Sequence, residues 1–189
     1  STLDRSSAAS DVYKRQVNEM SEFDYDLELI CTLYHPRHKM IKQLRKNFAS
    51  QGLKFYAYLY VPGLIRYIQE SLFHFPFYSF KEINLKPISI RETVEVLNKT
   101  KCMLDVNPPY QVSLSTRAYE AIASRRKYIT TNKHIMDYEF YDPNNILIID
   151  IDNPVIPKKF IQTPFNSVSE EVLYKYSVAG LVDDLFNDV

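Results

Sequence analysis

The stretch of residues 113–132, SLSTRAYEAIASRRKYITTN, brings hydroxyl groups and a carboxylate together at helical spacing. Ser113, Ser115 and Thr116 stand where a helix is expected to begin, and Glu120 follows about one turn later. The first backbone N–H groups of a helix are free and the helix dipole is positive there, so such a start binds anions. A carboxylate one turn further along can accept hydrogen bonds from both hydroxyls of a ribose. The pattern therefore predicts phosphate at the helix start and the sugar of a nucleotide at Glu120.

The same residues also fit a purely structural role. Ser113 or Ser115 can cap the helix, because serine is a preferred N-cap residue. Glu120 can be a solvated surface acid, as most glutamates are. The basic run at 125–127 lies at the expected helix end, where cations interact favourably with the dipole, so no chemistry is assigned to it. Ligand binding and simple capping both stay open on these grounds.

Short apolar runs alternate with helical segments along the chain, which is typical of a parallel α/β sheet. Five runs are expected strands: 27–32, 54–60, 102–106, 128–131 and 146–149. Right-handed crossovers predict a doubly wound, Rossmann-like parallel sheet flanked by helices. Ligands of such sheets bind outside the carboxyl ends of the strands. The loop 107–115 leaves the third strand at that edge.

Several helices have recognisable boundaries. A helix is expected over 36–50, with an apolar face and Gly52 as its stop, and another over 63–73. Two further helix starts carry the capping-box pattern of serine followed three residues later by glutamate: Ser89 with Glu92, and Ser167 with Glu170. The first of these helices has apolar residues at helical spacing: Ile90, Val94 and Leu97.

Composition argues against several classes of function. A formal net charge of +0 and a pI near 6.9 give no basic field, so nucleic-acid binding is not expected. The chain has only three glycines, at 52, 63 and 180, which cannot form a dinucleotide fingerprint or a Walker A loop. The Gly-x-Ser-x-Gly pattern of α/β-hydrolases is absent. No apolar run approaches the roughly 20 residues of a membrane-spanning helix.

Residues that could bind a metal are few and poorly arranged. His35 and His38 are three positions apart, but no further ligand lies near them in the sequence. The D-x-D sequence at 150–152 has the form that some sugar transferases use to hold a metal. It stands where a strand ends, however, and Asp is a common turn residue, so a turn is favoured and no metal is expected. Cys31 and Cys102 lie in apolar segments and are expected to be buried free thiols.

The two ends of the chain differ in character. Residues 1–16, STLDRSSAASDVYKRQ, are small, polar and aperiodic, and they look like a non-native segment derived from an adapter or vector. We expect this segment to be disordered and to make no packed contact with the fold. Residues 17–189 are expected to form the folded domain, as a fragment of a protein whose natural start is missing.

A series of short motifs between residues 104 and 150 matches a known group of proteins. The motifs are an LD strand, a P-x-Q loop, an S/T-x-R-x-x-E helix, a K-x-I-T-T-N strand and a Y-x-F-Y turn. Together they resemble the donor-binding half of bacterial GT-B glycosyltransferases from capsular-polysaccharide and lipopolysaccharide gene clusters. The segments YDLELICTLYHPRHKMIKQL and LYKYSVAGLVDDLF resemble the first and last elements of that half. The resemblance extends over most of residues 24–187.

The resemblance implies a nucleotide-sugar-binding domain that is the C-terminal half of a GT-B fold. It would serve sugar transfer to a growing cell-surface polysaccharide or lipopolysaccharide. Ser113 and Ser115 would cradle phosphate, Arg37 and Arg117 would offset the diphosphate charge, and Glu120 would bind the ribose. The catalytic base is expected in an N-terminal acceptor domain outside this chain, so no catalytic residue is assigned. The nucleotide diphosphate sugar is the donor substrate, and no cofactor or metal is required.

The implied partners are the nucleotide sugar, a glycan or lipid-linked acceptor, and the missing N-terminal domain, with no nucleic acid. The implied location is the cytoplasm, including the inner face of the plasma membrane through peripheral contact. Two departures from the group are visible: Ser113 replaces a usual glycine, and the loop 32–38 lacks a small residue often found there. The alternative is a non-catalytic α/β interaction domain or a degenerate nucleotide-binding module, with the aromatic segment 72–80 as its partner surface. The transferase hypothesis predicts that three side chains converge on one cleft at the strand ends: Arg37, Arg117 and Glu120.

Overall fold

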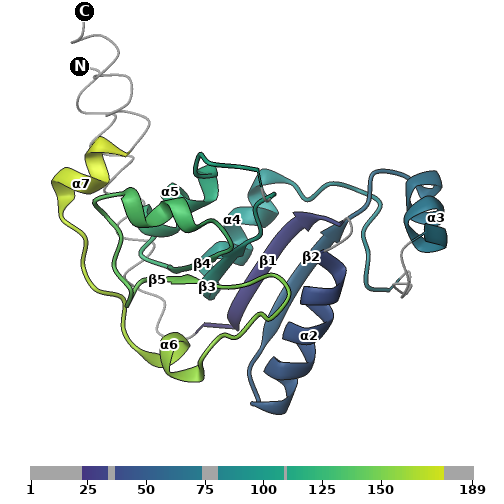
Figure 1. The fold of residues 1–189 in the computed structure, drawn as a ribbon, viewed down its shortest axis with the longest axis horizontal. Helices are drawn as coiled ribbons and strands as arrows, with labels where there is room; N and C mark the ends of the chain where they lie inside the picture. The colour runs from purple at the N-terminus through teal and green to yellow at the C-terminus, as the bar shows by residue number, and fades with distance from the viewer. Residues whose placement is uncertain (1–22, 34–36, 74–80, 109, 177–189) are drawn as a thin grey trace, which may run out of the picture.

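Five parallel strands form the centre of the protein, in the order β2-β1-β3-β4-β5 (Figure 1). The computed structural model describes residues 23–33, 37–73, 81–108 and 110–176. The strands are β1 (Tyr25–Thr32), β2 (Phe55–Tyr60), β3 (Thr100–Asp105), β4 (Lys127–Thr130) and β5 (Ile146–Ile148). All four pairings are parallel. The predicted Rossmann-like parallel sheet is confirmed, and each predicted strand is present with slightly different ends.

Some of the sequence predictions concern residues outside the described ranges. They include the adapter-like segment 1–16, the start of the first helix at Pro36 and the neighbouring His35. They also include most of the aromatic segment 72–80 and the closing helix beyond residue 176. These predictions stay predictions.

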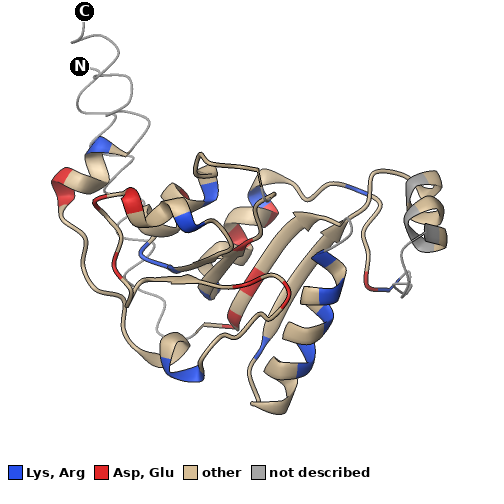
Figure 2. Ribbon diagram, in the orientation of Figure 1, with Lys and Arg blue, Asp and Glu red and all other residues tan. Residues whose placement is uncertain are grey.

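One face of the sheet is covered by α2 (Arg37–Ser50) and α6 (Lys158–Gln162). The apolar residues of α2 recur at helical spacing and are buried against the sheet, as predicted: Met40, Ile41, Leu44 and Phe48. Gly52 follows α2 with a φ of 67°, a left-handed conformation that favours glycine and ends the helix. Figure 2 shows lysine and arginine residues distributed along α2. The helix α6 was not predicted, because five residues are too few for a helical period to stand out.

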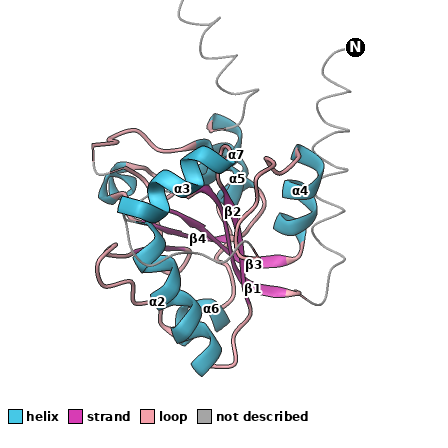
Figure 3. Cartoon of the chain, turned by 90° about the vertical axis from the view of Figure 1, so that its right-hand side faces the viewer, coloured by secondary structure: helices cyan, strands magenta, loops and turns pink. Residues whose placement is uncertain are grey.

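The opposite face is covered by α4 (Ile90–Asn98), α5 (Thr116–Ala123), the 3-10 helix η1 (Lys133–Asp137) and α7 (Glu170–Lys175). Figure 3 shows α2 and α4 on opposite sides of the sheet. Buried side chains of these elements and of the sheet form the second core: Leu97, Met103, Ala118, Ala121, Ile122, Tyr128, Ile135, Phe140 and Ile146. The predicted helix at 63–73 is also present, as α3 (Leu64–Phe73). Helices on both faces make the fold doubly wound, as expected.

Two predicted helix starts have different outcomes. The capping box of Ser89 and Glu92 is confirmed, with each side chain accepting the backbone N–H of the other residue. The cap predicted at Ser167 is wrong, because α7 begins later and the side chain of Ser169 accepts from the backbone N–H of Val172. The apolar spacing of α4 also does not describe a buried face. Its first two members are 86% and 40% exposed, and only Leu97 is buried.

The connections of β1 and β3 run to opposite faces of the sheet. After β1 the chain forms α2 on one face, and after β3 it forms α5 on the other. Adjacent strands whose connections diverge in this way form the switch point at which open α/β sheets bind ligands. The starts of α2 and α5 both lie at this carboxyl edge of the sheet.

Candidate functional site

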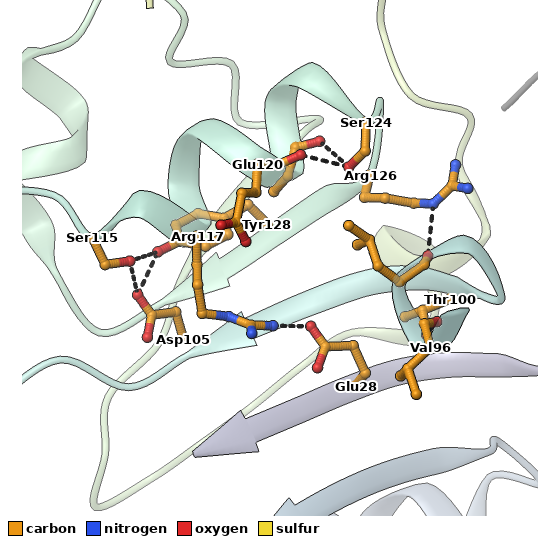
Figure 4. A network of polar contacts seen from close by, with 12 residues as sticks. Glu28, Val96, Thr100, Asp105, Ser115, Arg117, Glu120, Ser124, Arg126 and Tyr128 are labelled. Carbon is orange, nitrogen blue, oxygen red and sulfur yellow. Dashed lines mark hydrogen bonds and ion pairs between the residues drawn. The ribbon is translucent and has the colours of Figure 1, made fainter. Parts of the chain in front are cut away.

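The start of α5 is not capped by its own serine. Ser115 occupies the N-cap position with an extended backbone (φ −77°, ψ 157°), yet its side chain accepts no backbone N–H. The hydroxyl of Ser115 instead donates a hydrogen bond to the carboxylate of Asp105 at the end of β3 (Figure 4). The capping role considered for Ser115 is therefore wrong. Its hydroxyl is also engaged, so it is not directed toward a phosphate as the resemblance implied.

Asp105 ties the start of α5 to β4. The hydroxyl of the buried Tyr128 donates to the same Asp105 oxygen at 2.8 Å. Burial, together with the Asp105 charge, raises the pKa of Tyr128 far above its ordinary value, so Tyr128 stays a neutral donor. The carboxylate also lies beside the positive end of α5, where it is favourable but weakens the attraction for another anion. The sequence reasoning missed this role, although an acid at a strand end was visible.

Arg117 points into the protein, toward Glu28 of β1. Its Nη2 donates to Oε1 of Glu28, whose side chain is only 1% exposed. Among the described residues, Oε2 of Glu28 and Nε of Arg117 are buried without a hydrogen-bond partner. Burial raises the pKa of Glu28 to about 7; Arg117 lowers it, and Asp105 and Glu120 raise it further. The diphosphate role predicted for Arg117 therefore competes with an internal carboxylate.

Arg37 joins the two strands of the switch point. It is the first residue of α2, and its Nη1 donates to the carbonyl of Thr32 at 3.0 Å. Its Nη2 donates to the carbonyl of Val106, directly after β3. The guanidinium thus lies between the carboxyl ends of β1 and β3, and these two donors are directed at main-chain carbonyls.

Glu120 is exposed on α5. Figure 4 shows its side chain on the same side of the helix as Arg117, and its charge raises the pKa of Glu28. Within the described part of the chain, its carboxylate makes no hydrogen bond or ion pair. The residue is therefore available to a ligand, as the ribose hypothesis requires, and it is equally compatible with a surface acid.

A cavity of about 340 Å³ lies at the carboxyl ends of β3, β4 and β5. Its polar lining includes Asn107, Gln111, Thr131, Asn132, His134 and Asp150. Ser113 lines an adjoining cavity with Gln111 and His134. Arg37, Arg117 and Glu120 line neither of these two cavities. Arg117 and Glu120 lie together on α5, and Ser115 is its N-cap, but neither of these two cavities unites Arg37, Arg117 and Glu120, so their predicted convergence on one cleft stays a prediction.

Side-chain amides hold the loops of this edge in place. Thr130 Oγ1 donates to Asn107 Oδ1 at 2.9 Å, and the backbone N–H of Asn107 donates to Thr131 Oγ1 at 3.0 Å. Asn132 Nδ2 donates to the carbonyl of Ser113 at 3.2 Å. The polar residues that follow β4 therefore position the loop before α5. Their run of donors and acceptors at a strand end was the signal for this role, which the sequence reasoning did not assign.

The D-x-D sequence forms a turn, as predicted. Asp150 Oδ1 accepts the backbone N–H groups of Asp152 at 2.7 Å and Asn153 at 3.4 Å. Across the ranges that the structure describes, no group of three or more His, Cys, Asp or Glu side chains is arranged to hold a metal. None of the described helices is both long and apolar enough to span a bilayer.

Both cysteines are free thiols, as predicted; Cys102 is buried, whereas Cys31 is only partly buried. Burial raises the pKa of Cys31 to about 11, against the opposing effect of Arg37. Burial likewise raises the pKa of Cys102 to about 12. Neither thiol is activated as a nucleophile, because the reactive thiolate is disfavoured at both positions.

No protein-family model matches the chain, and no curated protein matches it. A function must therefore be argued from the site and from the motifs themselves, since one fold serves many functions.

Proposed function

We propose that this chain binds a nucleotide diphosphate sugar at the start of α5. It would act as the donor-binding domain of a glycosyltransferase that extends a cell-surface polysaccharide or lipopolysaccharide. The observation that carries the proposal is the start of α5 itself, a first turn left uncapped by its serine at the switch point of an open parallel sheet. The motif resemblance over residues 104–150 supplies the substrate class.

In the proposed complex the diphosphate lies against the first backbone N–H groups of α5. Glu120 accepts hydrogen bonds from two ribose hydroxyls, and Ser113, whose residue is exposed, can donate a hydroxyl to phosphate. Ser115 contributes through its backbone, because its hydroxyl is engaged by Asp105. The cavity at the ends of β3, β4 and β5 gives space to another part of the donor.

The remaining parts of the proposal lie outside these residues. The acceptor would be a glycan or a lipid-linked glycan, and the catalytic base would come from an acceptor domain of the same protein. The positive end of α5 and Arg37 would balance the diphosphate charge, so the proposal requires no metal. Transfer would take place in the cytoplasm, at the inner face of the membrane.

A second candidate is a non-catalytic α/β interaction domain. The guanidinium groups expected to hold a diphosphate already have protein partners, namely Glu28 for Arg117 and main-chain carbonyls for Arg37. In addition, α3 carries four apolar side chains that are 47–76% exposed: Leu64, Ile65, Ile68 and Leu72. An exposed apolar helix face of this kind is typical of a contact surface.

Calorimetric titration of the chain with a panel of nucleotide sugars tests the proposal. We expect one nucleotide class to bind, and Glu120→Gln to weaken that binding about tenfold, because a charge-assisted hydrogen bond is lost. Glu120→Ala should weaken it further, and neither change should lower the unfolding temperature. The control Glu171→Ala removes an exposed acid from α7 and should leave the affinity unchanged.

Two results would contradict the proposal in different ways. Unchanged affinity in Glu120→Ala would make Glu120 a surface acid and remove the site assignment. Failure of the unmodified chain to bind any nucleotide sugar would favour the interaction domain instead.

A further inference from the structure

Glu28 lies in the middle of β1 and is almost wholly buried, whereas Lys127, which is also buried, stands at the start of β4. The neighbours of Glu28, Leu27 and Leu29, belong to the core on the α2 side, so Glu28 points to the opposite face, beneath α5. Its register partner in β3 is Met103, a member of the apolar core on that face. A carboxylate in such a place is costly unless it is paired, and Arg117 is its partner.

The charges around Glu28 are unbalanced. Arg117 contributes one positive charge from α5, while Asp105 of β3 and Glu120 of α5 add two further carboxylates. From β2 the titratable neighbour is Tyr56. Three carboxylates thus share one guanidinium among these described residues. Like charges and burial both favour the protonated form of a carboxyl group, which agrees with a Glu28 pKa of about 7.

The pair between Arg117 and Glu28 is incomplete. A guanidinium can bind a carboxylate through two parallel hydrogen bonds, which is the strong and specific arrangement. Here a single bond joins Nη2 to Oε1, and within the described residues the buried Nε and Oε2 atoms have no partner. Unsatisfied buried groups favour any rearrangement that gives them partners.

We propose that Glu28 is a positioning residue for donor binding, which holds the Arg117 guanidinium beneath α5 and sets how much of its charge reaches the diphosphate. This inference rests on the proposed function. While Glu28 is ionised, an internal carboxylate neutralises Arg117. When Glu28 is protonated, the ion pair is lost and the guanidinium acts as a full cation at the start of α5. Donor affinity therefore rises as the pH falls through about 7.

The test is the pH dependence of nucleotide-sugar affinity in the full chain. A nucleotide sugar is the right probe because both ends of its diphosphate are esterified and its charge stays constant, whereas a terminal phosphate titrates near pH 6. We expect the affinity of the unmodified chain to rise roughly fivefold between about pH 8 and pH 6, the size of a typical coupling between two sites. Glu28→Gln should bind as tightly at pH 8 as the unmodified chain does at pH 6, with little pH dependence. The control Glu171→Gln should keep the unmodified profile.

The direction in which Glu28→Gln changes the affinity distinguishes a positioning role for Glu28 from a purely structural one. A damaged fold would weaken binding, so tighter binding by Glu28→Gln at pH 8 supports the proposal. An unchanged pH profile in Glu28→Gln, or weaker binding at every pH, overturns it.

A measurement without variants gives a second check, because binding at pH 7 should take up protons. Calorimetry in two buffers of different protonation enthalpy measures this uptake, and a value of zero overturns the proposal. If the unmodified chain binds no nucleotide sugar at any pH, the proposed function fails, and this inference fails with it.

Discussion

The starts of α4 and α5 lie on the same face of the sheet, and their hydrogen bonds differ. At α4, the side chains of Ser89 and Glu92 each accept the other's backbone N–H, so the helix end satisfies itself. At α5, Ser115 turns away from the backbone to Asp105 and leaves the first turn uncapped by its side chain. A helix start with a purely structural role can use a capping box. A helix start without this cap has polar groups available to a ligand, and the missing cap costs some stability.

The buried residues next to α4 and α5 also differ. Leu97 is the buried residue of α4, whereas the buried surroundings of α5 include the charged pair of Arg117 and Glu28. Buried pairs of this kind seldom add stability compared with apolar residues of similar size. Their presence under the uncapped helix, and not under the capped one, is consistent with a site at α5.

The largest expected effect comes from Arg117→Ala. This change leaves Glu28 buried without its counter-charge, which should lower the free energy of unfolding by about 3 kcal/mol at pH 8. The loss should shrink toward pH 6, because a carboxyl group with a raised pKa takes up a proton and no longer carries a buried charge. Denaturant unfolding at both pH values measures the difference. The control Arg91→Ala breaks an exposed pair with Glu95 on α4 and should change stability little; equal losses in the two variants would contradict the contrast.

A smaller effect is expected for Ser115→Ala. Asp105 loses one of its two hydroxyl donors and keeps Tyr128, so the free energy of unfolding should fall by about 1.5 kcal/mol. Donor affinity should stay within about twofold, because the backbone N–H groups of α5 are untouched. Ser115→Thr retains a hydroxyl and serves as the matched control. A large loss of affinity in Ser115→Ala, with Ser115→Thr normal, would show that this hydroxyl contacts the ligand after all.

The smallest effect is expected for Ser89→Ala at the start of α4. Loss of the capping box should lower the midpoint of thermal unfolding by about 2–4 °C. Nucleotide-sugar affinity should not change, since α4 has no part in the proposed site. Thermal melts and calorimetric titration of the same preparation measure both quantities. A reduced affinity would mean that α4 also contributes to donor binding, which would contradict the contrast between the two helix starts.

The elements of the fold were predictable because their signals are local. The apolar run of β1, the periodic residues of α2 and the capping box of α4 each depend on residues within a few positions of one another. Two local signals led to wrong predictions. Ser167 has the capping-box spacing, but the serine next to the helix is the one that caps it, and Ile90 has helical spacing on a face that stays exposed.

The candidate site was less predictable, because its contacts join distant parts of the chain. Glu28 stands inside an apolar strand, and nothing near it in the sequence identifies Arg117 as its partner. Asp105 and Tyr128 are likewise brought to Ser115 only by the pairing of β3 with β4. The sequence could identify α5 and the exposed Glu120, but side-chain directions depend on the assembled sheet.

The reactivity of the cysteine thiols can report local opening of the central sheet. Cys31 and Cys102 lie on β1 and β3, the strands of the switch point, and the pKa of each thiol is raised by burial. An alkylating reagent attacks the thiolate, so modification of the fully buried Cys102 must wait until the central strands separate and its pKa returns to normal. The alkylation rate at Cys102 therefore measures how often the central sheet opens, without any added label.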